Sequence, residues 1–184
     1  VGNILGVSDF GGQLSRMEVM YIQNTYLNAY APGSFDQLWT DAYAGLFKSA
    51  NIMIPFAEEK GEFIHAGIAK VLKAYTMITL VDFFGDIPYT EANQGVSNPN
   101  PHADKGAIVY DSALMRLDSA IVDFSLPTTA APANDLFYGG DPGKWTTVAK
   151  TLKLKIYVQT RLVDPGAKDK ITALINDGDL VYSA

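Results

Sequence analysis

The stretch AYTMITLVDFFGDIPYTEANQG, residues 74–95, decides how the middle of this chain folds. Its apolar run leads into Asp82, Gly85, Asp86 and Pro88. Gly85 is expected to be the left-handed residue that follows a helix, and Pro88 prevents the helix from resuming. We expect the Asp86 carboxylate to accept backbone amides freed by this turn. Asp82 faces the negative end of the helix dipole, so an amide, hydroxyl or basic partner is expected beside it.

The same two aspartates could instead be an acid/base pair. That chemistry needs carboxylates with separated pKa values and a cleft for the substrate. The spacing of Asp82 and Asp86 gives no sign of a cleft, so the structural interpretation is favoured. Finding both carboxylates together in an open, solvent-lined crevice would contradict it.

The segment before this turn, from about Glu62 to Phe84, is apolar on nearly every side. A helix of that kind lies buried between neighbours rather than on a surface. We expect it to be the central element of the domain. Its main stripe consists of Ile64, Ile68, Val71, Leu72, Tyr75, Ile78 and Val81.

Other helices are predicted on both sides of this central one. Ser34 and Gln37 form a capping-box pattern, and the apolar face that follows is expected to end or kink at Pro55. A narrower stripe runs from Tyr110 to Phe124. Two further helices are expected to start with an Asp-Pro pair, at Asp141–Pro142 and Asp164–Pro165, and the last should stop at Gly178.

Four or five helices joined by long loops predict an all-α fold, a helical-hairpin scaffold of the TPR-like kind. Period-two alternation is lacking except for a short piece, LVYSA, at residues 180–184. The length of 184 residues predicts a single domain over residues 1–184. No run of about 18 apolar residues was found, so a membrane-spanning helix is not expected.

Composition excludes several classes of function. The net charge of −6 disfavours nucleic acid as a partner, because such a surface repels phosphate backbones. Cysteine is absent, which excludes disulfides, thiolate metal sites and a thiol nucleophile. His65 and His102 stand apart without a zinc-type spacing, and the Asn98–Asp104 loop lacks the EF-hand pattern. We therefore predict no metal and no cofactor.

Three ordered motifs resemble the SusD/RagB-like family. They are LVDFFGDIPYTEA at residues 80–92, WTDAYAGLFKSAN at 39–51 and YGGDPGKWTTVAKTLKLKIYVQTRL at 138–162. The residues that match the family's motifs are Trp39, Tyr43, Asn51, Asp82, Gly85, Asp86, Pro88, Gly140, Asp141 and Trp145. One departure is Lys155, where relatives usually carry arginine; Arg161 keeps a basic group further along.

The resemblance implies a function and a location. Members are lipid-anchored glycan-binding proteins on the surface of Bacteroidetes, and they pass oligosaccharides to a SusC-like TonB-dependent transporter of the outer membrane. They bind sugars and do not cleave them. The ending ALINDGDLVYSA is similar to a point midway through such proteins, which implies that this chain is their N-terminal part and that the lipid anchor lies outside it.

Candidate sugar contacts come from position rather than from the family. Aromatic faces bind sugar rings, and platforms of this kind sit on loops or helix ends. The aromatic candidates are Phe10, Tyr26, Tyr30, Tyr89 and Tyr138, with Asp9, Gln13 and Arg16 as polar neighbours of the first group. The aromatics on helical faces, Trp39 and Trp145 among them, are expected to be core.

Two alternatives stay open. The chain could be a protein-interaction scaffold of an outer-membrane uptake complex, without direct sugar binding. It could also be a glycoside hydrolase, which would need two carboxylates roughly 5 to 10 Å apart across a groove. Asp82 and Asp86 are poor candidates for that pair.

Overall fold

The computed structural model describes residues 32–181 of the chain. Its contacts divide the chain into two compact units, Val1–Ser49 and Ala50–Ala184, and each is described by itself. The described part of the first unit is helical. It contains a 3₁₀ turn η1 (Pro32–Phe35), α2 (Asp36–Thr40), a π-helical segment η2 (Asp41–Phe47) and the first residues of α3 (Lys48–Lys60).

Helix α2 does not begin directly after Ser34, the residue predicted to cap it. The residue that precedes α2 is Phe35, and it makes no side-chain cap. Gln37 donates instead to Asp41 Oδ1, one turn ahead, at 2.8 Å. Pro55 does not end the helix, because α3 continues to Lys60. The helix keeps Ala50, Ile54 and Ala57 buried, and that packing outweighs the missing amide of the proline.

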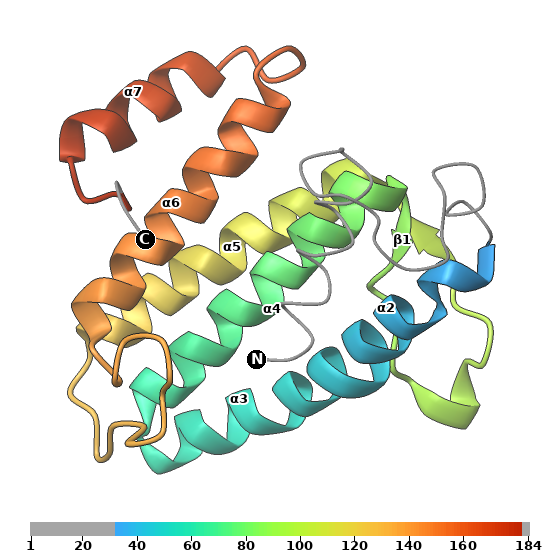
Figure 1. Ribbon diagram of the computed structural model, residues 1–184, viewed down its shortest axis with the longest axis horizontal. Helices are drawn as coiled ribbons and strands as arrows, with labels where there is room; N and C mark the ends of the chain where they lie inside the picture. The colour runs from blue at the N-terminus through green and yellow to red at the C-terminus, as the bar shows by residue number, and fades with distance from the viewer. Residues whose placement is uncertain (1–31, 182–184) are drawn as a thin grey trace, which may run out of the picture. The chain divides into compact units, whose positions relative to one another are not determined.

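The second unit is an all-α stack of consecutive helices. After α3 come α4 (Phe63–Phe84), α5 (Gly106–Ser125), α6 (Pro142–Thr160) and α7 (Ala167–Asp177). Each of these last four helices runs opposite to the one before it (Figure 1). Helix α4 packs chiefly on α5, α5 on α6 and α6 on α7. This arrangement confirms the predicted helical hairpins.

Helix α4 is the central element, as its composition predicted. Met77, Ile78 and Leu80 are fully buried. They share the core with Val109 and Leu117 of α5 and Ile156 of α6, which are also fully buried. Close packing of this kind supplies most of the stability of a helical stack.

By length and hydropathy α4 also qualifies as a membrane span, although no membrane-spanning helix was expected from the sequence. Its apolar window has a mean hydropathy of 1.3, but 72% of that window is buried inside the protein. The buried core helix of a folded domain has these same properties. The burial therefore accounts for the composition without a bilayer.

Two short strands lie in the loop between α4 and α5, where no strand was predicted. Residues Ile87–Pro88 form β1 and residues Ala103–Asp104 form β2, and the two pair antiparallel. Of the possible strand at residues 180–184, the described positions 180 and 181 are irregular, and the rest lies outside the described residues. The β1–β2 pair closes the long loop back onto the end of α4.

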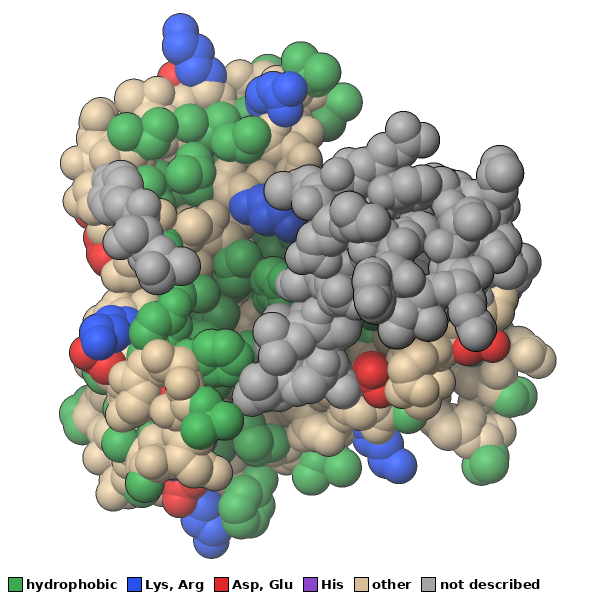
Figure 2. Space-filling model, viewed as in Figure 1, with side chains coloured by type: hydrophobic (Ala, Val, Ile, Leu, Met, Phe, Trp, Pro, Cys, Tyr) green, Lys and Arg blue, Asp and Glu red, His purple; other side chains and the backbone are tan. Residues whose placement is uncertain are grey.

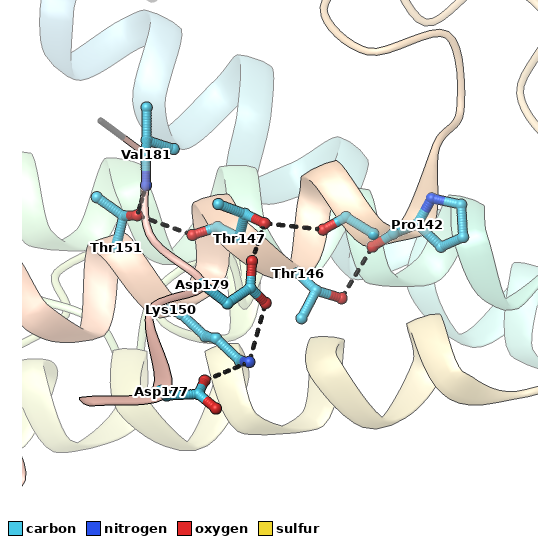
Figure 3. Close-up of polar contacts among 9 residues, drawn as sticks. Pro142, Thr146, Thr147, Lys150, Thr151, Asp177, Asp179 and Val181 are labelled. Atoms are coloured by element: carbon cyan, nitrogen blue, oxygen red, sulfur yellow. Dashed lines mark hydrogen bonds and ion pairs between the residues drawn. The ribbon is translucent and has the colours of Figure 1, made fainter. Parts of the chain in front are cut away.

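The last helix is fastened to α6 by polar contacts (Figure 3). Lys150 of α6 reaches Asp177 Oδ2 at 2.6 Å and Asp179 Oδ2 at 2.9 Å. Thr147 donates to the Asp179 carboxylate, and the backbone amide of Val181 donates to Thr151 Oγ1 at 3.0 Å. These contacts hold the segment after α7 along α6.

Helix α6 starts as predicted, and α7 does not. Asp141 accepts from the amides of Gly143 and Lys144, and Pro142 occupies the first turn of α6. Helix α7 starts at Ala167 with Gly166 before it. Asp164 accepts from the Gly166 amide at 2.8 Å, so it fixes the turn before the helix rather than capping it.

Candidate functional site

The end of α4 is held by its two aspartates, but not in the way the sequence suggested. Gly85 has φ +76° and ψ −106°, so its φ is positive without the left-handed helical ψ that was expected. Asp86 does not bind the amides freed by its own turn. Its Oδ1 accepts from the Gly106 amide at 3.0 Å and its Oδ2 from Lys105 Nζ at 2.7 Å. Asp86 thus caps the start of α5 from a distance, because that helix has no cap of its own.

Asp82 has all three kinds of partner that its position required. Tyr110 of α5 donates its hydroxyl to Asp82 Oδ1. Gln159 of α6 donates to the same oxygen at 2.9 Å, and Lys155 Nζ lies 2.7 Å from Oδ2. Burial and the bond to Asp82 raise the pKa of the Tyr110 phenol. One carboxylate at the end of α4 therefore ties together α4, α5 and α6.

An open groove with a volume of about 490 Å³ lies beside this turn. Its lining includes both carboxylates, together with Tyr110, Gln159 and Thr160. An apolar wall is made by Val81, Ala107 and Val163. No cleft was expected here from the sequence, and that expectation was wrong.

The two carboxylates thus lie together in an open groove, which is the arrangement that was expected to contradict their purely structural interpretation. Their spacing therefore no longer decides between that interpretation and an acid/base pair, and their hydrogen-bond partners have to. The hydrogen bond from Lys105 and that from the Gly106 amide hold the pKa of Asp86 below its usual value. Asp82 is occupied by a phenol, an amide and an ammonium group. All of these partners donate, so both carboxylates serve as hydrogen-bond acceptors that hold the helices together. The groove offers hydrogen-bonding groups beside an apolar wall.

A second, smaller cavity of about 240 Å³ lies near Tyr89, one of the predicted sugar contacts. Tyr89 follows β1, and its half-buried ring lines this cavity. Its hydroxyl accepts from Arg116 Nη2 at 2.9 Å. Lys73 Nζ lies 5.9 Å from the centre of its ring.

Tyr138 has a packing role in the structure. Its ring meets that of Trp145 edge to face, with centroids 5.3 Å apart. Trp145 is 2% exposed, in agreement with its assignment to the core. Its Nε1 donates to Asp135 Oδ2 at 2.7 Å, and the Gly140 amide donates to the same oxygen at 2.9 Å. The motif residues Gly140 and Trp145 therefore fix the loop that leads into α6.

The motif at residues 39–51 is divided between the two units. Trp39 and Tyr43 stack with ring centroids 5.3 Å apart, and Tyr43 meets Phe47 edge to face at 5.1 Å. Phe47 is 2% exposed. In the second unit, Asn51 accepts a hydrogen bond from Lys73 Nζ through its Oδ1. The remaining predicted sugar contacts, Asp9, Phe10, Gln13, Arg16, Tyr26 and Tyr30, lie outside the described residues.

Polar residues in the loop after β1 bind one another. Asp104 accepts from the amides of Tyr89 and Thr90 at 2.9 and 2.8 Å. Glu91 accepts from the His102 amide and from Asn98, and these bonds lower the pKa of Glu91 to about 2. Within residues 32–181, no group of three or more potential ligands could hold a metal ion.

Charged residues inside the core were not predicted from the sequence. Lys70 and Lys73 lie on α4 and are 5% and 6% exposed, and Asp123 of α5 is 6% exposed. The sequence offers one signal for them, which is that each lies at an apolar position of a helix. Because charged residues are rarely buried without a partner, this placement indicates a buried ion pair or hydrogen bond. The role of Arg116, on α5, was not predicted from the sequence either.

Comparison with known proteins gives the chain its family. The SusD-like family model, described as "Starch-binding associating with outer membrane", matches residues 9–183. No match was found among curated proteins.

Solved structures share the fold. A SusD/RagB family protein from Bacteroides thetaiotaomicron aligns with 97% of this chain at a TM-score of 0.80 and 24% identity. A chitin-binding protein aligns with 80% at a TM-score of 0.66 and 28% identity. A SusD-like protein from Bacteroides thetaiotaomicron aligns with 82% at a TM-score of 0.67 and 27% identity.

This chain spans 39%, 32% and 31% of the lengths of these three structures, respectively. Their helical, TPR-like fold agrees with the stacked antiparallel helices seen here. Because the family model matches far more than half of its length, this chain belongs to the SusD-like family.

Proposed function

We propose that this protein binds an oligosaccharide at the cell surface and delivers it, without cleaving it, to a SusC-like TonB-dependent transporter of the outer membrane. The observation that carries the proposal is the family match over residues 9–183, to a family described as starch-binding and associated with the outer membrane. A relative of 28% identity named as a chitin-binding protein supports the same class of ligand.

The groove beside the α4 turn is the described surface that suits a sugar best. Sugar hydroxyls need donors and acceptors, and Gln159, Thr160 and the two carboxylates provide them. The C–H faces of a sugar ring need apolar contact, which Val81 and Val163 provide. A volume of about 490 Å³ is in the range of small-ligand sites, roughly 300–1,000 Å³.

Binding of starch and chitin oligosaccharides, measured by calorimetry, tests this proposal. We expect Gln159→Leu to weaken binding about tenfold, because the variant removes an amide from the groove while Tyr110 and Lys155 still hold Asp82. Gln94→Leu is the matched control, an exposed glutamine outside the groove. Failure to bind any oligosaccharide in a broad glycan screen would overturn the proposal.

A second candidate function is a protein-interaction scaffold of the uptake complex, without sugar binding. Exposed apolar residues after α6 favour it, since Leu162 and Val163 are 86% and 81% exposed. Figure 2 shows that hydrophobic side chains reach the surface of the described helices. Co-purification with the transporter, combined with no effect of sugars on tryptophan fluorescence, would favour the scaffold over the glycan carrier.

A further inference from the structure

The small cavity beside Tyr89 is built differently from the groove. It lies between α4, the end of β1 and α5, and its volume is about 240 Å³. Its lining consists of Lys70, Tyr89, Ser112, Met115, Arg116 and Ser119. Two cations, three hydroxyl groups and one thioether thus line it, and none of the lining residues within 32–181 is a carboxylate.

Arg116 has an N–H group without a hydrogen-bond acceptor. It is half-buried, and its Nε is buried without a hydrogen-bond partner. One of its terminal nitrogens donates to Tyr89 Oη at 2.9 Å. Among residues 32–181, no carboxylate lies within ion-pair distance of Arg116. Because a buried N–H donor is costly to leave without a partner, the Nε of Arg116 calls for an acceptor in the cavity.

The neighbouring charges make an anionic acceptor favourable. The Lys70 ammonium group already has three partners: Asp123 Oδ2 at 2.5 Å, Glu58 Oε1 at 2.7 Å and Ser119 Oγ at 2.9 Å. Lys73 donates to the neutral oxygen of Asn51. Burial, followed by the charge of Arg116, lowers the pKa of Lys73 to about 8. Among residues 32–181, the two carboxylates of this cluster, Asp123 and Glu58, therefore pair with Lys70, and neither pairs with Arg116.

We propose that this cavity binds an oxyanion carried by a sugar ring, a uronate carboxylate or a sulfate ester, with Arg116 as its principal ligand. A planar guanidinium group binds such oxyanions through paired N–H donors. Ser112 provides a hydroxyl for the sugar, and Tyr89 and Met115 provide apolar surface. The volume is below that of drug-sized sites and fits a single ring rather than an oligosaccharide. The inference rests on the proposed function, and it names acidic glycans as the class of ligand.

The arginine Nε–Hε resonances provide a direct test. The chain has three arginines, Arg16, Arg116 and Arg161, so the spectrum is simple, and the Arg116→Lys variant assigns the peak. We expect titration with glucuronate to move the Arg116 signal, and glucose at the same concentration to leave it in place. Glucose 6-sulfate and inorganic sulfate, added in parallel, show whether the carboxylate or the sulfate is preferred and whether the sugar ring contributes.

The variants test the assignment to this residue. Arg116→Lys keeps the charge but loses the Nε donor, and it is expected to weaken glucuronate binding about tenfold. Arg161→Gln is the matched control, because Arg161 donates to the Val158 carbonyl group and does not line the cavity. Its binding should equal that of the unmodified protein. Should Arg116→Lys fail to fold, the Arg16→Gln and Arg161→Gln variants assign the other two peaks and so identify that of Arg116, and Ser112→Val removes a second contact from the cavity.

The outcomes separate this inference from the proposed function. Equal shifts with glucose and glucuronate, or an Arg116 signal that no anion moves, overturn the acidic site even if starch or chitin oligosaccharides still bind. Glucuronate binding that depends on Arg116 supports the acidic site even if no neutral oligosaccharide binds. An equal loss of affinity in Arg161→Gln and Arg116→Lys also overturns the assignment.

Discussion

Lys70 is a charged residue in α4, the most apolar of the described helices. It is 5% exposed, and its ammonium group bonds to Asp123, Glu58 and Ser119. Burial raises the pKa of Asp123, although the bond to Lys70 acts against this effect. The pair therefore carries a large desolvation cost that its mutual attraction offsets only while both partners remain.

Replacing Lys70 with methionine should be strongly destabilising. Asp123 would stay buried without its cation, so we expect the free energy of unfolding to fall by about 3 kcal/mol. The double variant Lys70→Met/Asp123→Leu removes both charges, and it should recover most of that loss. Urea unfolding measures both. A single variant as stable as the unmodified protein, or a double variant no better than the single one, would contradict this prediction.

At the scale of elements, α4 and α5 approach each other closely at Gly67. A Cβ atom at this position would lie 2.5 Å from Cε1 of Phe124, whose ring is 8% exposed. Gly67 lies within α4, the longest of the described helices, and glycine inside a helix is normally unfavourable by about 1 kcal/mol relative to alanine. Its presence there is explained by the contact with the ring.

The Gly67→Ala variant tests which effect is larger. If helix propensity dominated, the substitution would stabilise the protein by about 1 kcal/mol. We expect the opposite, a loss of about 1 to 3 kcal/mol, because the ring of Phe124 has to move. Combining Gly67→Ala with Phe124→Leu makes room for the methyl group, so the two effects should not add. Thermal unfolding of the three variants measures this coupling, and strict additivity would show that the contact does not matter.

Elements that are determined by neighbouring residues could be predicted from the sequence, and elements that depend on contacts with distant segments could not. Helix α4 was predicted within one residue at its start, and the Asp141 cap of α6 was predicted correctly. Both follow from side chains a few residues apart. The passage of α3 through Pro55 and the β1–β2 pair could not be predicted, because each depends on segments packed against them. Gly85 was correctly identified as the residue with positive φ, but its ψ is set by the route of the chain into β1.

At the scale of the whole molecule, the buried charges make stability depend on pH. Burial and Arg116 lower the pKa of Lys73 from 10.5 to about 8 in the folded state. Between pH 8 and 10.5 the unfolded chain therefore binds more protons than the folded one, and stability from this group rises with pH. Above pH 10 the raised pKa of Tyr110 acts in the opposite direction, because the folded state keeps a proton that the unfolded state loses.

Between pH 8 and 10, the contribution of Lys73 to the pH dependence of stability can be measured separately from that of Tyr110. We expect the free energy of unfolding of the unmodified protein, relative to that of Lys73→Met, to increase with pH there by up to about 1 kcal/mol per pH unit. The difference between the two proteins cancels groups that they share. Urea unfolding at several pH values measures it. A difference that stays constant, or that decreases with pH, would be inconsistent with a buried, charged Lys73.

By itself the sequence determined the helical class, the central helix, the turn at Gly85 and the family, because periodicity, caps and short motifs are encoded by residues close together in the chain. Only the tertiary structure decided which polar groups meet. Asp82 joins Tyr110 and Gln159 across three helices, and Arg116 meets Tyr89 beside Lys70 and Lys73. Both cavities arise from these contacts. Residues 27 to 77 positions apart are brought together only by packing, and no local pattern records which of them will be neighbours.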